Sequence, residues 1–143
     1  MSRPIPTGAN LESLIDTLAN RDGMARRKAR KSLVAMGKSA VPSLIQALRN
    51  SYVDQVRWEA AKAIGAIGDA TATPFLVKAL EDQDPDVAWL AAEALQKFKK
   101  AAWPALLRTL ITQPTYSDRC VKACTMCFGI SEKRDSTICS HFF

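Results

Sequence analysis

The residues that could hold a metal ion lie close together in the last quarter of the sequence. Cys120, Cys124 and Cys127 follow a C-x3-C-x2-C spacing, which is one that binds a four-iron cluster. A second set combines Cys124 and Cys127 with Cys139 and His141, four ligands of the kinds that zinc binds. Iron–sulfur chemistry and a structural zinc site are therefore the two metal chemistries to weigh.

The same cysteines also fit one face of a helix. Cys120, Cys124 and Cys127 fall at i, i+4 and i+7. Buried thiols pack like small apolar side chains. We expect a helix over residues 120–127 that buries these thiols, and neither a metal ion nor another cofactor. Zinc binding through Cys139 and His141 stays open as an alternative, although no glycine supports the irregular turn that a C-x2-C metal site normally uses.

Two tryptophans are the strongest candidates for binding a partner. At 100° per residue, the apolar residues of the segment 56–67 lie within about 60° of Ala60, whereas Trp58 lies about 160° away. Trp89 stands in the same relation to Ala91, and Arg27 occupies the equivalent position one unit earlier. Three interpretations of this column stay open: a surface for a partner, packing between neighbouring units, and self-association into a homodimer.

Positive charge is concentrated in one segment. Residues 21–31 contain six basic residues and one acid, a net charge of +5 out of +6 for the whole chain. Such a segment suits an acidic protein partner or phosphates, and it equally suits a solvated face at the end of a repeat array. The predicted partner-binding residues are Trp58, Trp89, Arg27, Arg30, Lys31 and Lys62.

No arrangement of residues typical of an enzyme is visible. The chain has one histidine, and it lacks a glycine-rich phosphate loop, a paired-histidine metal motif and a Ser/His/Asp set. We therefore expect a non-catalytic protein. The first function to consider is a protein-binding scaffold or adaptor, and the alternative is a nucleic-acid-binding accessory protein that uses the basic segment 26–31.

A repeat positions these residues. One type of segment recurs as SLIDTL (13–18), VPSLIQAL (41–48), TPFLVKAL (73–80) and WPALLRTL (103–110), with first leucines 30, 32 and 30 residues apart. A second type alternates with it as ARKSLVAMG (29–37), AAKAIGAIG (60–68) and AAEALQKFK (91–99), each with an i, i+4, i+7 apolar stripe. This pattern predicts about four units, each a pair of short helices.

Boundary residues agree with helices. Asp22 and Asp84 are predicted N-caps, and Gly37 and Gly68 fall where a helix ends in a left-handed residue. Prolines at positions 42, 74 and 104 fall in the first turn of each first helix, where proline is tolerated. No segment alternates strongly enough to predict a strand. We therefore expect an all-α fold in which helix pairs stack into an α-solenoid.

The stretch 54–95 closely resembles HEAT-like repeats of the short class often called phycobilin-lyase-type. The residues that carry the resemblance are Asp54, Val56, Arg57, Ala60, Ala61, Ala63, Ile64, Gly65, Ile67, Gly68, Asp69, Pro74, Leu76, Ala79, Leu80, Asp84, Pro85 and Val87. It covers about residues 10–112 and implies that the second helices line a concave binding surface. The third repeat departs from the family, with Ala88 in place of its arginine and Lys97 and Lys99 in place of its glycine helix ends.

Domain organisation and location follow from these patterns. We expect one domain, with three repeats and the first helix of a fourth in residues 1–112, and a degenerate second helix and C-terminal cap or tail in 113–143. The sequence shows neither a signal peptide nor about 20 consecutive apolar residues, so we expect a cytoplasmic protein that does not enter a membrane.

Overall fold

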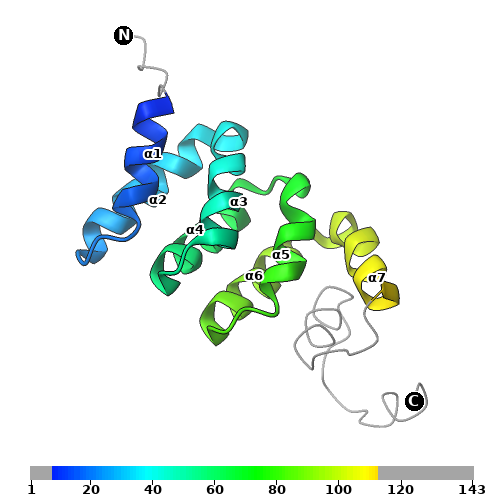
Figure 1. Cartoon of the computed structure of the whole chain (residues 1–143). Helices are drawn as coiled ribbons and strands as arrows, with labels where there is room; N and C mark the ends of the chain where they lie inside the picture. Colours follow the sequence, from blue (N-terminus) through cyan, green and yellow to red (C-terminus); the bar gives the residue numbers. More distant parts are fainter. Residues whose placement is uncertain (1–7, 113–143) are drawn as a thin grey trace.

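Helices stacked in two layers make up the structure, a computed structural model that describes residues 8–112 (Figure 1). The first helices of successive units are α1 (Gly8–Thr17), α3 (Val41–Asn50), α5 (Thr73–Ala79) and α7 (Trp103–Thr112). The second helices are α2 (Gly23–Met36), α4 (Asp54–Ile67) and α6 (Pro85–Phe98). Short 3-10 turns, Gly37–Ala40, Ala70–Ala72 and Lys99–Ala102, lead into α3, α5 and α7. Residues 8–112 contain no strand.

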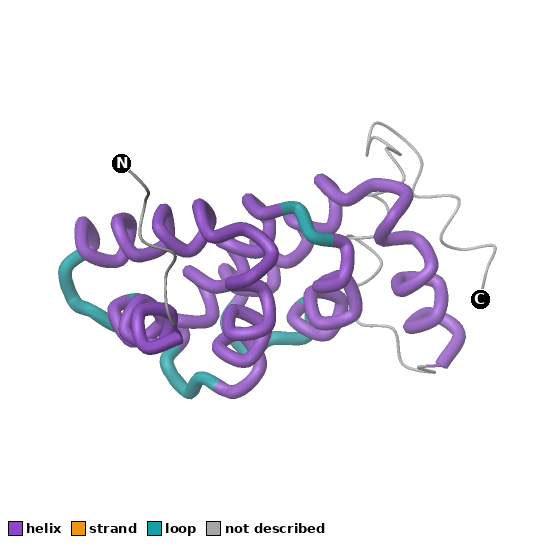
Figure 2. Tube along the Cα trace, turned by 90° about the horizontal axis from the view of Figure 1, so that it is seen from above, coloured by secondary structure: helices purple, strands orange, loops and turns teal. Residues whose placement is uncertain are grey.

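Packing between the helices confirms the predicted α-solenoid. Each first helix packs on its neighbours α1–α3–α5–α7, and the second helices pack in the order α2–α4–α6 (Figure 2). The helix pairs α1/α2, α3/α4 and α5/α6 are the first three predicted units, and α7 begins the fourth. None of the helices in the described part of the chain is long and apolar enough to span a membrane.

The core follows the predicted apolar stripes. Ala29 and Leu33 of α2 and Ala60 and Ile64 of α4 are buried, as are the equivalent residues of α6. The last residue of each stripe is only half-buried, because it lies in the final turn of its helix, at the edge of the stack. Burial of one stripe per helix against its neighbours is what holds the units together.

Helix ends also agree with the prediction, with one exception. The side chains of Asp22 and Asp84 accept hydrogen bonds from the backbone N–H groups of the first turns of α2 and α6. Gly37 and Gly68 have positive φ angles of 63° and 75°. Lys99 takes the same role with φ 47°, whereas Lys97 lies inside α6 and does not end it.

Arg57 links α4 to the segment that precedes α6. Its Nε donates to Asp82 Oδ2 at 2.9 Å, and its Nη1 donates to the Ser51 carbonyl oxygen at 2.9 Å. The hydrogen bond to Asp82 raises the pKa of the Arg57 guanidinium. In the next unit Ala88 stands at the equivalent position and cannot form this link.

The predicted helix over 120–127, the zinc ligands Cys124, Cys127, Cys139 and His141, and the division at residue 113 lie outside the described residues. They remain predictions from the sequence.

Candidate functional site

Trp58 is half-buried, contrary to the expectation that it projects away from the core. It packs against the hydrophobic core even though it lies opposite the apolar stripe of α4. The reason is that α4 packs between α2 and α6. Residues of both helices therefore flank the indole. Lys62, one turn later on α4, places its Nζ 4.4 Å from the centre of the Trp58 ring, which is a cation–π contact.

Trp89 behaves differently from its equivalent in α4. Its side chain is 60% exposed. Trp58 lies on α4, which has α6 beside it. For Trp89 on α6, the sequence predicts the following helix of this layer at residues 120–127, outside the described part of the chain. The two tryptophans therefore occupy equivalent positions in the repeat but not equivalent environments.

A buried carboxylate holds two of the basic residues of α2. Glu59 is 3% exposed, and its Oε2 accepts a hydrogen bond from Arg30. Arg26 Nε lies 3.5 Å from Glu59 Oε1. Both arginines are mostly shielded from solvent. Part of the positive charge that the sequence places on this helix therefore bridges α2 and α4 and is not a free surface.

The other predicted binding residues separate into two groups. Arg27 and Lys62 are exposed and line one hollow together with Arg30 and Trp58. Lys31 is exposed on α2 but does not line this hollow, and neither does Trp89. The structure thus brings together four of the six predicted residues.

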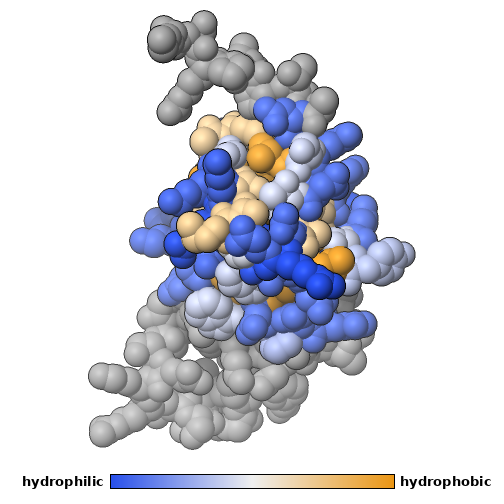
Figure 3. All heavy atoms as spheres, turned by 90° about the vertical axis from the view of Figure 1, so that its left-hand side faces the viewer, coloured by the Kyte–Doolittle hydropathy of each residue, from blue (hydrophilic) through white to orange (hydrophobic). Residues whose placement is uncertain are grey.

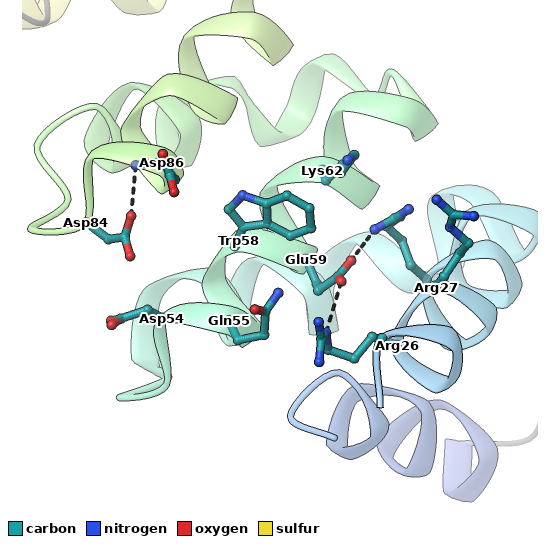
Figure 4. Close-up of a pocket in the computed structure, with 11 residues that line it drawn as sticks. Arg26, Arg27, Asp54, Gln55, Trp58, Glu59, Lys62, Asp84 and Asp86 are labelled. Atoms are coloured by element: carbon teal, nitrogen blue, oxygen red, sulfur yellow. Dashed lines mark hydrogen bonds and ion pairs between the residues drawn. The ribbon is translucent and has the colours of Figure 1, made fainter. Parts of the chain in front are cut away.

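The hollow around Trp58, which we call the tryptophan pocket, has a volume of about 420 Å³ (Figure 4). Its basic residues are Arg26, Arg27, Arg30 and Lys62. Its acidic residues are Asp54, Glu59, Asp84 and Asp86. Figure 4 shows Trp58 between these groups, with Arg26 and Arg27 on one side and Asp84 and Asp86 on the other.

The acidic side of the tryptophan pocket was missed in the sequence. Asp84 was expected only as a helix cap, and its Oδ1 indeed accepts the Asp86 N–H at 2.8 Å. The available signal was the clustering of aspartates at the starts of α4 and α6, because adjacent helices bring their N-terminal ends to the same edge of the stack. Glu59 gave no comparable signal.

A second hollow of about 260 Å³ lies between α4 and α6, and we call it the alanine groove. It shares Arg30 and Lys62 with the tryptophan pocket, so the two hollows adjoin. Small residues are among those that line it, and they let the two helices approach closely there. A Cβ atom built on Gly65 would lie 3.0 Å from Ala94 Cβ. The second helices α2, α4 and α6 together form one face of the stack, which we call the second-helix face. This face is polar around Trp58 and more apolar at the alanine groove.

The charge on the α1 end of the stack is mostly solvated. Figure 3 looks onto this end and shows hydrophilic residues over much of it, with smaller apolar patches between them. Arg27, Lys28 and Lys31 are exposed. A polar outer face of this kind keeps a terminal repeat soluble.

The described residues are suited to non-covalent binding. Within residues 8–112, no group of three or more His, Cys, Asp or Glu residues is arranged to hold a metal ion. The tryptophan pocket offers an aromatic surface, guanidinium groups and carboxylates, which recognise charged and amphipathic side chains.

Comparison with known proteins identifies the repeat. The sequence pattern of a family described as HEAT repeats matches residues 41–123. No curated protein matches the chain. A solved complex of CpcE and CpcF of phycocyanin lyase from Nostoc sp. PCC7120 matches with a TM-score of 0.57 and 28% identity, over 83% of this chain and 52% of that one. The chain thus spans about half the length of that relative.

An engineered protein of known crystal structure also matches, with 22% identity and a TM-score of 0.46, over 82% of this chain and 60% of that one.

Proposed function

Because the chain belongs to the HEAT repeat family, we propose that it is a non-catalytic protein-binding scaffold that uses its second-helix face. The observation that carries the proposal is the tryptophan pocket, in which Trp58 lies between side chains of opposite charge. Trp89, farther along the same row of helices, supplies a second aromatic anchor that is 60% exposed.

The chemistry of the pocket favours a protein partner over a small molecule. Small-molecule sites are mostly apolar with a few polar groups. The tryptophan pocket has the opposite composition, since Trp58 is the one large apolar residue among charged ones. Tryptophan and arginine are the residue types that contribute most often to protein–protein hot spots, where each can contribute about 2 kcal/mol or more to binding.

The solved relative supports the same interpretation. CpcE and CpcF form a complex with each other, so repeats similar to these take part in a protein–protein assembly. This chain covers about half of that relative. We propose that this chain shares the capacity to bind a protein, and we do not propose the lyase activity for it.

Nucleic acid binding is the second candidate, and the observation that favours it is the exposed row Arg27, Lys28 and Lys31 on α2. Two features weaken it. Glu59 holds Arg26 and Arg30, and Asp84 and Asp86 line the neighbouring pocket, where they would repel a phosphate backbone. Binding of a phosphate backbone would also weaken steeply with salt, in proportion to the number of contacts.

Affinity capture from the native host's lysate tests the proposal. The baits are the wild-type chain, the double variant Trp58→Ala/Trp89→Ala, and the control Leu107→Ala/Ile111→Ala, which removes exposed apolar residues from α7. We expect the wild type and the control to retain the same protein at 0.3 M salt, and the tryptophan variant to lose it.

Other outcomes of this capture have definite meanings. Equal retention by all three baits would contradict the proposed surface. Retention of nucleic acid at low salt, lost at 0.3 M, would favour the second candidate. Retention of only a second copy of the chain by the wild type and the control, and its loss by the tryptophan variant, would mean that the tryptophans mediate self-association.

A further inference from the structure

The tryptophan pocket has two walls of opposite charge. Arg27 projects from α2 on one side, next to the arginines that Glu59 holds. Asp84 and Asp86 stand at the start of α6 on the other side. Trp58 and Lys62 of α4 lie between the walls, as Figure 4 shows. The charge along the hollow therefore changes from positive on the α2 side to negative on the α6 side.

Neither wall is neutralised by the protein itself. Glu59 carries one negative charge and contacts both Arg26 and Arg30, so the α2 side stays net positive. On the α6 side, Asp84 Oδ1 caps the helix by accepting backbone N–H groups. Within the described residues, the ion pairs involve neither Asp84 nor Asp86. Each wall can therefore attract an opposite charge from a partner.

The size of the hollow limits the form of the partner. About 420 Å³ admits a few side chains, whereas a helix about 10–12 Å wide would not enter it. The helices that carry the two walls, α2 and α6, are two helix spacings apart, roughly 16–20 Å between their axes. An extended chain advances about 3.3 Å per residue, so it crosses that distance in about five residues.

We infer that the tryptophan pocket binds an extended segment of a partner protein with a lysine or arginine and an aspartate or glutamate about five residues apart. The cation lies against Asp84 and Asp86, and the carboxylate lies against Arg27. An apolar side chain between them contacts the exposed part of Trp58. This inference rests on the proposed scaffold function and adds the chemistry and direction of the segment.

Segments of uniform charge fit less well. A purely acidic segment would place carboxylates against Asp84 and Asp86, and a purely basic one would meet Arg27 and Lys62. Like charges at these distances cost binding energy, whereas the mixed segment pairs both walls. The alanine groove beyond Lys62 continues the surface for the apolar remainder of the segment.

Selection from a displayed library of random 12-residue peptides tests this inference. The targets are the wild type, a charge-swapped variant Arg27→Glu/Asp86→Lys, and a control Lys78→Glu/Asp16→Lys. The control exchanges the same charges on exposed residues of the first-helix layer, away from the pocket. Within residues 8–112, no side-chain hydrogen bond or ion pair involves Arg27 or the Asp86 carboxylate, so we expect the swapped variant to fold.

We expect the wild type and the control to enrich peptides with the two charges about five residues apart, in one fixed order. The swapped variant should bind those peptides at least tenfold more weakly and should enrich no charge order, because neither wall then keeps a net charge. Trp58→Ala should abolish binding of peptides from both selections.

Two results would overturn the inference in distinguishable ways. Peptides selected on the wild type that require Trp58 but show no charge order, or that bind the swapped variant as well as the wild type, would leave the scaffold function standing without the charge-directed segment. A selection in which no peptide requires Trp58 would contradict both.

Discussion

The joint between α2 and α4 and the joint between α4 and α6 connect equivalent helices by different means. In the first, Arg26 and Arg30 meet the buried carboxylate of Glu59. In the second, the positions equivalent to Arg30 and Glu59 are Ala61 and Leu90, both buried and apolar. A repeat with one period thus contains one charged joint and one apolar joint.

This difference explains where the tryptophan pocket forms. Gly65 and Ala94 let α4 and α6 approach closely, and α4 packs more extensively on α6 than on α2. Long arginine side chains occupy the other joint and line the hollow beside Trp58. The close joint brings α4 and α6 together, and the charged joint supplies charged side chains to the proposed binding surface.

The largest expected effect comes from widening the apolar joint. Gly65→Leu places a side chain where even a Cβ would lie 3.0 Å from Ala94 Cβ, so the helices must separate. We expect a loss of about 3 kcal/mol in the free energy of unfolding, measured by urea denaturation. Ala66→Leu, at an exposed neighbouring position, is the control and should change it by less than about 0.5 kcal/mol. A loss below about 1 kcal/mol for Gly65→Leu would show that the joint is not tightly packed.

The charged joint should be nearly as sensitive to the loss of its carboxylate. Glu59→Gln keeps the shape and leaves two arginines without a counter-charge, so we expect a loss of about 2 kcal/mol in the free energy of unfolding. The estimate is below that for a fully buried pair because both arginines retain some contact with solvent. Unchanged thermal unfolding of Glu59→Gln would refute a structural role for this joint.

A double-mutant cycle sharpens this prediction. Combining Arg30→Gln with Glu59→Gln should give a coupling energy of about 1 kcal/mol. The matched control is the exposed pair Glu93 and Lys97 on α6, 3.0 Å apart and four residues apart in sequence. Its coupling should not exceed about 0.5 kcal/mol. Equal couplings would mean that the buried pair is no stronger than a surface pair.

The two tryptophans should differ in their contribution to stability. Trp58 packs against the core, so Trp58→Ala should lower the free energy of unfolding by about 1.5 kcal/mol. Trp89 is 60% exposed, and Trp89→Ala should cost about 0.5 kcal/mol or less. Thermal unfolding of the two single variants measures the difference. A larger loss for Trp89→Ala would assign that residue to packing and not to a free surface.

The smallest effect concerns Asp69, which follows α4. A hydrogen bond from the Thr71 N–H at 3.0 Å lowers the pKa of its carboxyl below the usual value of 3.8. The stability from this group is therefore present above pH 3.8 and is lost as the pH falls through the lower folded-state pKa. We expect Asp69→Asn to reduce the acid-induced loss of stability slightly. An acid titration with the same profile for both proteins would contradict this.

The repeat and its helix ends could be predicted from the sequence because they depend on local patterns. Asp22, Asp84, Gly37 and Gly68 act within a few residues of their own positions, and all four have the predicted roles. The position in the third unit that is equivalent to Gly37 and Gly68 holds Lys99. It also ends its helix with a positive φ angle, because the repeat imposes the same turn there.

The environment of the candidate binding residues could not be predicted in the same way. A helical wheel places Trp58 relative to its own helix, but its burial depends on side chains from α2 and α6. Glu59 lies beside the apolar stripe and has no sequence signal of burial, since its partners Arg30 and Arg26 come from another helix, 29 and 33 residues earlier. The contacts of the site depend on how neighbouring repeats are placed, which a single helix does not encode.

The most direct test of the binding surface uses the three tryptophans of the chain, Trp58, Trp89 and Trp103. Each indole N–H gives its own signal in a ¹H–¹⁵N NMR spectrum, assigned with single Trp→Phe variants. On addition of the captured partner, we predict that the signals of Trp58 and Trp89 shift while that of Trp103, on α7, stays in place. A shift of the Trp103 signal alone, or unchanged signals for Trp58 and Trp89 in the complex, would contradict binding at the second-helix face.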